Sequence, residues 1–213
     1  MTRPAYWSRA RRALVEADPI LGEIIARHPR TALISRGDAF ATLARSIVGQ
    51  QISVKAADAV WARLARCCPE MTPQRLLRKR AATLRACGLS ERKVEYLRDL
   101  AQHFESGELD LRALTRMDDE AVIARLTDVR GIGRWTAEMF LIFNLLRPDV
   151  LPLDDLGLLK AISRHYLGEA PTRDLLGRAG REKVLALASP WAPWRSVATW
   201  YLWRSLDPVP VEY

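Results

Sequence analysis

The chain has 213 residues, a length that suits one large or two small domains with a hydrophobic core that needs no disulfide bonds. Hydrophobic residues make up 49% and charged residues 27%, which excludes an intrinsically disordered chain and a membrane-embedded one. The net charge of +8 favours an anionic partner such as nucleic acid, although a genome rich in guanine and cytosine also raises the arginine content.

Apolar residues recur at three- and four-residue intervals along most of the chain, which predicts an all-α protein. The first clear helix lies between an N-cap at Asp38 and a stop at Gly49, and the next runs from Val54, capped by Ser53, to about Cys67. Further starts are predicted at Thr72-Pro73, Ser90 with an end near Gly107, Asp118, near Asp155, Pro171 and Pro193. We expect about ten helices, several of them short.

The three cysteines, Cys67, Cys68 and Cys87, are too few to ligate an iron–sulfur cluster or a closed zinc site made only of cysteines. We expect them to be reduced packing residues. The first residues carry basic side chains but no continuous apolar run, so we expect no signal peptide. We therefore expect a cytoplasmic location.

The strongest local motif is Leu126–Ala137, in which a helical segment ends, Gly131 and Gly133 flank one apolar residue, and an apolar helix follows. Glycines permit backbone torsions that other residues resist, and the first amides of a helix have no partner within it. Such a turn can hold a phosphate with its backbone N–H groups, or it can be a helix–turn–helix corner in which glycine only allows close packing.

A pair of carboxylates, Asp154 and Asp155, follows Pro152 and precedes an apolar-periodic helix. One of the two is expected at the helix N-terminus, where an ionised carboxylate is favoured. An ordinary N-cap explains one carboxylate and leaves the other free to point elsewhere.

Four of the seven tryptophans lie within the segment 191–203. On a helix that starts at Pro193 most of these rings are expected in the core, while one or two are available to wall a pocket for a flat substrate.

Five segments, at 40–57, 87–94, 126–137, 151–160 and 191–196, together resemble the helix-hairpin-helix (HhH-GPD) DNA glycosylase superfamily. Within it they are most similar to the 3-methyladenine DNA glycosylase II, or AlkA, type. The resemblance runs from about Phe40 to Leu206. It implies two helical lobes around a cleft, in the compact form without the extra N-terminal β domain. One lobe would span about 36–150 and contain the hairpin at 126–137, and the other would combine about 1–35 with 151–213.

The resemblance also implies roles for individual residues. Asp155 would be the catalytic carboxylate and Asp154 the capping neighbour. The substrate pocket would be lined by Phe40, Trp135, Met139 and Trp203. DNA would be contacted by Gln50, Gln51, Ser53, Arg130, Gly131, Ile132, Gly133, Arg134 and Thr136. Backbone carbonyls of Thr127, Val129 and Gly131 would hold a Na⁺ or K⁺ ion.

The implied activity is a base excision repair glycosylase that flips an alkylated purine out of double-stranded DNA and hydrolyses its N-glycosidic bond, leaving an abasic site. Relatives that also cut the strand have a lysine at the position of Trp135, and tryptophan forms no Schiff base, so a monofunctional enzyme is expected. No cofactor is expected for catalysis, and no iron–sulfur cluster. We expect a monomer that works at the bacterial nucleoid.

Two alternatives remain at this stage. One is a glycosylase for another lesion, such as uracil, hypoxanthine or a mismatched base. The other is a non-catalytic helix-hairpin-helix module that binds DNA.

Overall fold

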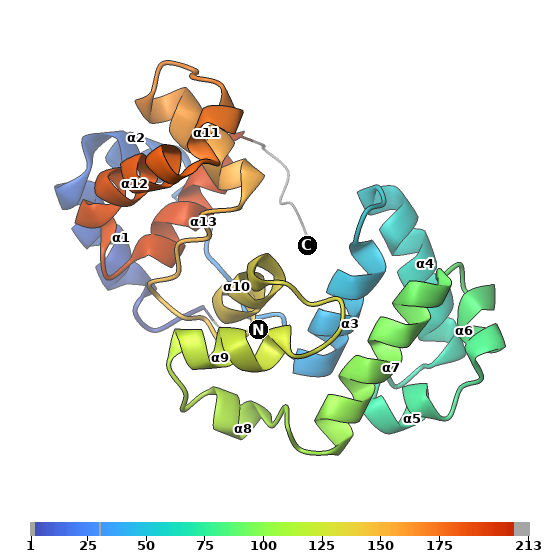
Figure 1. Cartoon of the computed structure of the whole chain (residues 1–213). Helices are drawn as coiled ribbons and strands as arrows, with labels where there is room; N and C mark the ends of the chain where they lie inside the picture. The colour runs from blue at the N-terminus through green and yellow to red at the C-terminus, as the bar shows by residue number, and fades with distance from the viewer. Residues whose placement is uncertain (1–2, 30, 207–213) are drawn as a thin grey trace. The chain divides into compact units, whose positions relative to one another are not determined.

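The structure, a computed structural model, describes residues 3–29 and 31–206 (Figure 1). Over these residues it contains thirteen α-helices, two 3₁₀-helices and no strand, which confirms the all-α prediction. The short helix α5 (Pro73–Leu77) begins at its predicted start, whereas α6 (Ala81–Ala86) and α8 (Leu111–Leu114) were not predicted because they are too short to show a clear apolar period. None of the described helices is long and apolar enough to cross a membrane.

The helices form two compact units. Unit 1 comprises the described residues up to Ser35 together with those from Leu141 onwards, and unit 2 comprises residues 36–140. The chain passes between the units after Ser35 and again within α10 (Arg134–Phe143). The sequence-based boundary at about 150 lies beyond the one observed after residue 140.

Unit 2 is built around its longest helix, α7 (Glu91–Glu105), which packs against α3, α5 and α6. The capping side chains predicted from the sequence are in place, for example Asp38, which accepts the amide of Ala41 at 2.7 Å. The other helices of the unit are α3 (Ala39–Gly49), α4 (Val54–Cys67), α9 (Asp119–Thr127) and the first part of α10.

Unit 1 is built around α13 (Arg195–Leu206), whose residues 196–202 are buried on every side and which packs against α1, α2 and α11. A helix that is buried on all sides lies in the centre of its bundle, and here the buried set includes the polar residues Ser196 and Thr199. Trp191 and Trp200 are core residues, as predicted for most of the clustered tryptophans. The remaining elements are α1 (Trp7–Ala17), α2 (Pro19–Arg27), α11 (Leu156–Tyr166), η1 (Thr172–Leu175), α12 (Arg178–Leu187) and η2 (Ser189–Trp191).

Asp18 connects three of these elements. Its Oδ1 accepts the amide of Leu21 at 3.0 Å and so caps α2, while its Oδ2 accepts the hydroxyl of Tyr166 at 2.8 Å and the indole N–H of Trp191 at 2.7 Å. Burial, with this hydrogen bond, raises the pKa of Tyr166. The residue therefore fixes α2 against α11 and η2.

Two glycines within helices of unit 1 test the packing. A Cβ at Gly180 would lie 2.6 Å from the carbonyl carbon of Leu175, whereas one at Gly22 would lie 3.6 Å from its nearest neighbours. We expect Gly180→Ala to lower the free energy of unfolding by about 1–3 kcal/mol through overpacking. Gly22→Ala, the matched control, should raise it by up to about 1 kcal/mol because alanine favours the helix. Urea unfolding of both variants measures this difference, and equal stabilities would contradict the close contact at Gly180.

Candidate functional site

Asp155 stands immediately before α11 and is its N-cap, with only 2% of its surface exposed. Its Oδ1 accepts the amide of Leu158 at 2.6 Å and the indole Nε1–H of Trp203 at 2.7 Å. Hydrogen bonds to an ionised acceptor are stronger than neutral ones, and the helix N-terminus adds its positive dipole end. The structure therefore holds one carboxylate group in a fixed orientation inside unit 1.

The neighbouring Asp154 is exposed and pairs with Arg181. Its expected role as the capping residue is wrong, because Asp155 has the extended backbone that an N-cap requires (φ −78°, ψ 110°) directly before the helix. Capping and the implied catalytic role thus fall on the same side chain.

Trp203 occupies a narrow space beside Asp155. Its ring stacks on Phe143 with centroids 5.7 Å apart and planes 13° from parallel. A Cβ at Gly157 would lie 3.1 Å from Cδ1 of Trp203 and 3.2 Å from Oδ1 of Asp155. Gly157 and Phe143 therefore shape the site, and sequence reasoning did not single out either residue.

The start of α13 is fixed to the segment that leads to Asp155. Asp149 accepts two bonds from the Arg195 guanidinium, at 2.7 and 2.6 Å, and the hydroxyl of Ser196 accepts the amide of Val150 at 2.8 Å. Planar bidentate pairs of this kind fix orientation as well as distance. Trp203 lies on α13 together with Arg195 and Ser196, and Asp155 follows Asp149 and Val150 in the chain. These contacts therefore fix the positions of both Asp155 and Trp203.

The predicted hairpin lies in unit 2, between the end of α9 at Thr127 and the start of α10 at Arg134. Gly131 has a φ of +85°, in the region that favours glycine, whereas Gly133 does not adopt a positive φ. Val129 and Ile132 are buried and anchor the turn. The side chain of Ile132 is thus a core group, and its amide closes the turn by donating to the carbonyl of Val129.

The two arginines expected to contact DNA from the hairpin have partners within the protein. Arg130 donates through its amide and its Nε to Asp99, at 2.8 and 3.1 Å. Arg134 pairs with Glu120 and Glu138, and the bond to Glu120 is the main cause of its raised pKa. Thr136, on the first turn of α10, is buried.

The loop after α3 contacts the hairpin directly. Nε2 of Gln50 donates to the carbonyl of Gly131 at 2.8 Å. Gln51 is exposed and has a φ of +60°, which is uncommon for a residue other than glycine. Ser53 caps α4 by accepting the amide of Ala56 at 3.3 Å. The structure therefore brings together the two segments that the sequence assigned to DNA.

The other expected pocket residues of unit 2 differ in their surroundings. Trp135 is half-buried and Met139 is buried, and their four-residue spacing places them on the same face of α10. Phe40 is 3% exposed and packs edge-on against Phe104 at 5.4 Å. Phe40 is thus a core residue of this unit.

The three carbonyls expected to hold a monovalent cation lie at the end of α9 and in the hairpin. The carbonyl of Val129 accepts the amide of Ile132 at 3.1 Å, and that of Gly131 accepts Gln50. Each carbonyl has a second lone pair, and an all-oxygen donor set suits a hard cation. The described residues contain no group of three or more His, Cys, Asp and Glu side chains placed to bind a metal.

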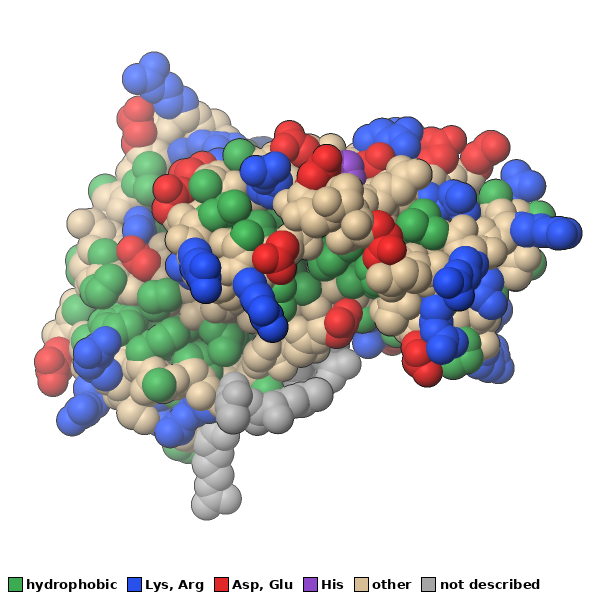
Figure 2. Space-filling model, turned by 90° about the horizontal axis from the view of Figure 1, so that it is seen from below, with side chains coloured by type: hydrophobic (Ala, Val, Ile, Leu, Met, Phe, Trp, Pro, Cys, Tyr) green, Lys and Arg blue, Asp and Glu red, His purple; other side chains and the backbone are tan. Residues whose placement is uncertain are grey.

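Lys and Arg side chains gather along the right-hand edge of Figure 2. In unit 2 the basic side chains of the segment 75–93 lie on α5, α6 and α7 and on the turn between α5 and α6. Some are paired, as Arg75 is with Glu70 at 2.8 Å. Lys93 differs from the exposed members because it is half-buried and bonds backbone carbonyls.

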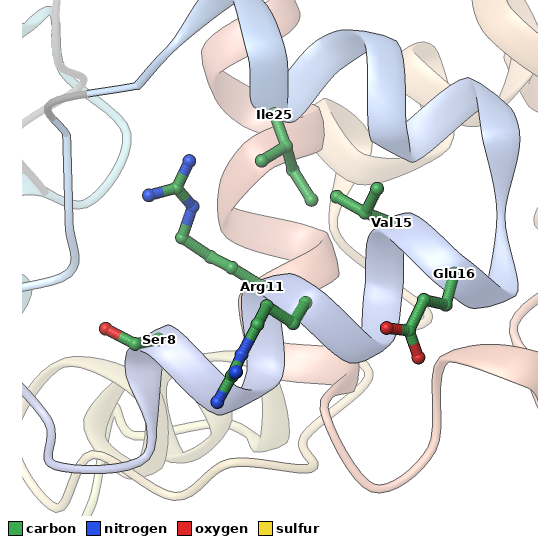
Figure 3. Close-up of a pocket in the computed structure, with 6 residues that line it drawn as sticks. Ser8, Arg11, Val15, Glu16 and Ile25 are labelled. Carbon is green, nitrogen blue, oxygen red and sulfur yellow. The ribbon is translucent and has the colours of Figure 1, made fainter.

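A separate pocket of about 400 Å³ lies on unit 1 (Figure 3). It is lined by Ile25 of α2 and by residues of α1 that include Arg11, Val15 and Glu16. None of the residues assigned from the sequence to catalysis or DNA lines it.

Comparison with known proteins identifies the family of the chain. Residues 44–184 match the HhH-GPD superfamily base excision DNA repair protein family. The chain is 33% identical to DNA-3-methyladenine glycosylase 1 of Schizosaccharomyces pombe, over 87% of this chain and 80% of that protein.

Solved structures are similar over nearly the whole chain. A DNA-3-methyladenine glycosidase from Bacillus halodurans superimposes with a TM-score of 0.82 at 34% identity, covering 96% of this chain and 92% of its own. A 3-methyladenine DNA glycosylase of Schizosaccharomyces pombe in complex with abasic DNA has a TM-score of 0.75 at 31% identity, covering 92% of this chain and 96% of its own. The chain therefore belongs to the HhH-GPD superfamily of base excision DNA repair proteins.

Proposed function

We propose that this protein is a monofunctional DNA N-glycosylase that removes alkylated purines, of the 3-methyladenine and 7-methylguanine type, from double-stranded DNA in base excision repair. The observation that carries the proposal is the carboxylate of Asp155, buried at the N-terminus of α11 and bonded to the indole of Trp203. The names of the relatives, which are 3-methyladenine glycosylases, support the substrate class.

The chemistry follows from the properties of a flipped nucleotide. A base inside the duplex is inaccessible, so it must leave the stack before its glycosidic bond can be broken. As that bond breaks, positive charge develops on the deoxyribose, and the carboxylate of Asp155 stabilises it. The cationic base takes the bonding electron pair and leaves as a neutral molecule. A water molecule then adds to the anomeric carbon through its oxygen and gives up one proton to the solvent, which leaves a hydroxyl group on the sugar.

An alkylated purine can leave without help from a separate acid, and its cationic ring is attracted to aromatic side chains. A purine methylated at N3 or N7 is already cationic, so it needs no proton from the enzyme to leave. A cationic ring also gains about 0.5–2 kcal/mol from an electron-rich indole face. Trp203 and Trp135 supply such faces in this proposal, with Met139 beside Trp135 on α10.

The hairpin and the preceding loop are proposed to hold the DNA. Amides around Gly131 and Gly133, next to the N-terminus of α10, would bind one phosphate, and Gln50 or Gln51 would fill the space that the flipped nucleotide leaves. A Na⁺ or K⁺ ion on the carbonyls of Thr127, Val129 and Gly131 would add positive charge near that phosphate. One copy of the chain carries all these groups, so we propose that it acts as a monomer.

Asp155→Asn tests the catalytic assignment. We expect release of 7-methylguanine from duplex DNA to slow by about 10²–10³-fold, because the developing charge loses its counter-charge, while DNA binding is retained. Asp154→Asn is the matched control, since Asp154 is exposed and pairs with Arg181, and it should keep the native rate. Base release by Asp155→Asn at the native rate would disprove the mechanism.

Trp203→Phe tests the hydrogen bond to Asp155 separately. Phenylalanine keeps a ring to stack on Phe143 but removes the Nε1–H donor, so single-turnover base release should slow by about tenfold. Trp194→Phe is the control, because Trp194 stacks on Tyr6 and does not donate to Asp155. An equal loss in both variants would show a general effect of tryptophan removal.

The monofunctional assignment is tested by incubating lesion-containing duplexes with the native protein and omitting alkali. We expect base loss from 3-methyladenine and 7-methylguanine duplexes without strand breaks, because Trp135 has no amine to form a Schiff base. Strand cleavage coupled to base loss, or an adduct trapped by borohydride, would contradict the assignment. Release of uracil or hypoxanthine in preference to the methylated purines would reassign the lesion.

A further inference from the structure

One face of α7 contacts both segments that are proposed to bind DNA. Lys93, Tyr96 and Asp99 recur at three-residue intervals, which places them in one row along the helix. Lys93 contacts the loop after α3, Tyr96 contacts the hairpin glycine, and Asp99 contacts Arg130. All three contacts lie within unit 2.

Lys93 closes the C-terminal end of α3. Its Nζ donates to the carbonyls of Val48 and Gln50, both at 2.7 Å. The last carbonyls of a helix have no partner within the helix and carry the negative end of its dipole, so a cation is favoured there. Burial lowers the pKa of Lys93, because a partly buried ammonium is less well solvated by water.

The loop that Lys93 holds contains a strained residue. Gln51 follows directly after Gln50 and has a φ of +60°. Such a conformation costs free energy and persists only where the surroundings determine it. Here the loop is fixed by Lys93 on one side and by the bond from Gln50 to Gly131 on the other.

Tyr96 and Asp99 hold the hairpin in the same way. The ring of Tyr96 fills the space above Gly131, where a Cβ would lie 2.6 Å from its Cγ. Asp99, whose side chain is only 13% exposed, accepts the amide of Arg130 at 2.8 Å and its Nε at 3.1 Å. The carboxylate thereby orients the peptide between Val129 and Arg130, one residue before Gly131.

We propose that Lys93, Tyr96 and Asp99 are positioning residues, which set the loop carrying Gln50 and Gln51 and the hairpin in the relative placement needed to insert into DNA and hold its backbone. They act through these segments and touch neither the base nor the reacting atoms. The geometry of this inference depends only on contacts within unit 2. Its consequence for catalysis rests on the proposed function.

Hydrogen–deuterium exchange on the free protein tests the geometry without any substrate. Lys93→Met should speed amide exchange in the peptide covering 48–53 by about tenfold, because two charge-assisted bonds are lost. Asp99→Asn should do the same mainly in the peptide covering 128–133. Lys183→Met, a loss of the same charge at an exposed site on α12, should change neither peptide. Unchanged exchange in both test variants would overturn the proposal.

Base release tests the consequence. Because insertion matters only where a stack must be opened, Lys93→Met should slow single-turnover release of 7-methylguanine by about tenfold or more from duplex DNA and clearly less from a single strand. Lys93→Arg, which keeps the charge, should recover part of the loss. Equal losses on both substrates would overturn the positioning role. Native protein that releases no alkylated base would instead overturn the proposed function, and the exchange experiment would still decide the geometry.

Discussion

The buried carboxylate of Asp155 needs hydrogen-bond donors, and this need links α11 and α13 in unit 1. Asp155 is almost fully buried, and an unpaired charge in that position is costly. Its donors come from the first turn of α11 and from Trp203 on α13, so both helices must be placed before the site exists. The burial of α13 in the core and the pairing of Arg195 with Asp149 hold the helix that carries Trp203.

Unit 2 has a different requirement. Its proposed DNA-binding segments are turns with little secondary structure of their own, so they need support from other elements. Short turns gain rigidity by bonding to a longer element, and α7 provides one. Lys93 and Asp99 satisfy backbone groups that the loop and the hairpin cannot satisfy internally. In both units, therefore, the central helix donates or accepts hydrogen bonds that fix the functional segment. In unit 1 α13 holds Asp155 through Trp203, and in unit 2 α7 holds the loop and the hairpin through Lys93 and Asp99.

Elements that were predicted correctly depend on residues close together in the sequence, whereas the start of α13, which was missed, depends on a contact with a distant residue. Asp38, Ser53 and Ser90 were predicted as caps and are caps, because a cap involves residues only three positions apart. The helix expected at Pro193 begins two residues later, at Arg195, where Asp149 accepts its amide. The segment expected to start a helix at Pro171 forms a 3₁₀-helix.

The sequence by itself predicted most of the longer helices, caps such as Asp38 and Ser53, and the hairpin, since each depends on residues that are close together in the chain. Only the tertiary structure decided that Asp155 is both cap and buried acceptor, because its indole donor lies 48 residues away. It likewise decided the bonds from Lys93 to carbonyls 45 and 43 residues distant. Local sequence patterns do not predict such pairs. The pairs form only when packed helices bring distant side chains within hydrogen-bonding distance.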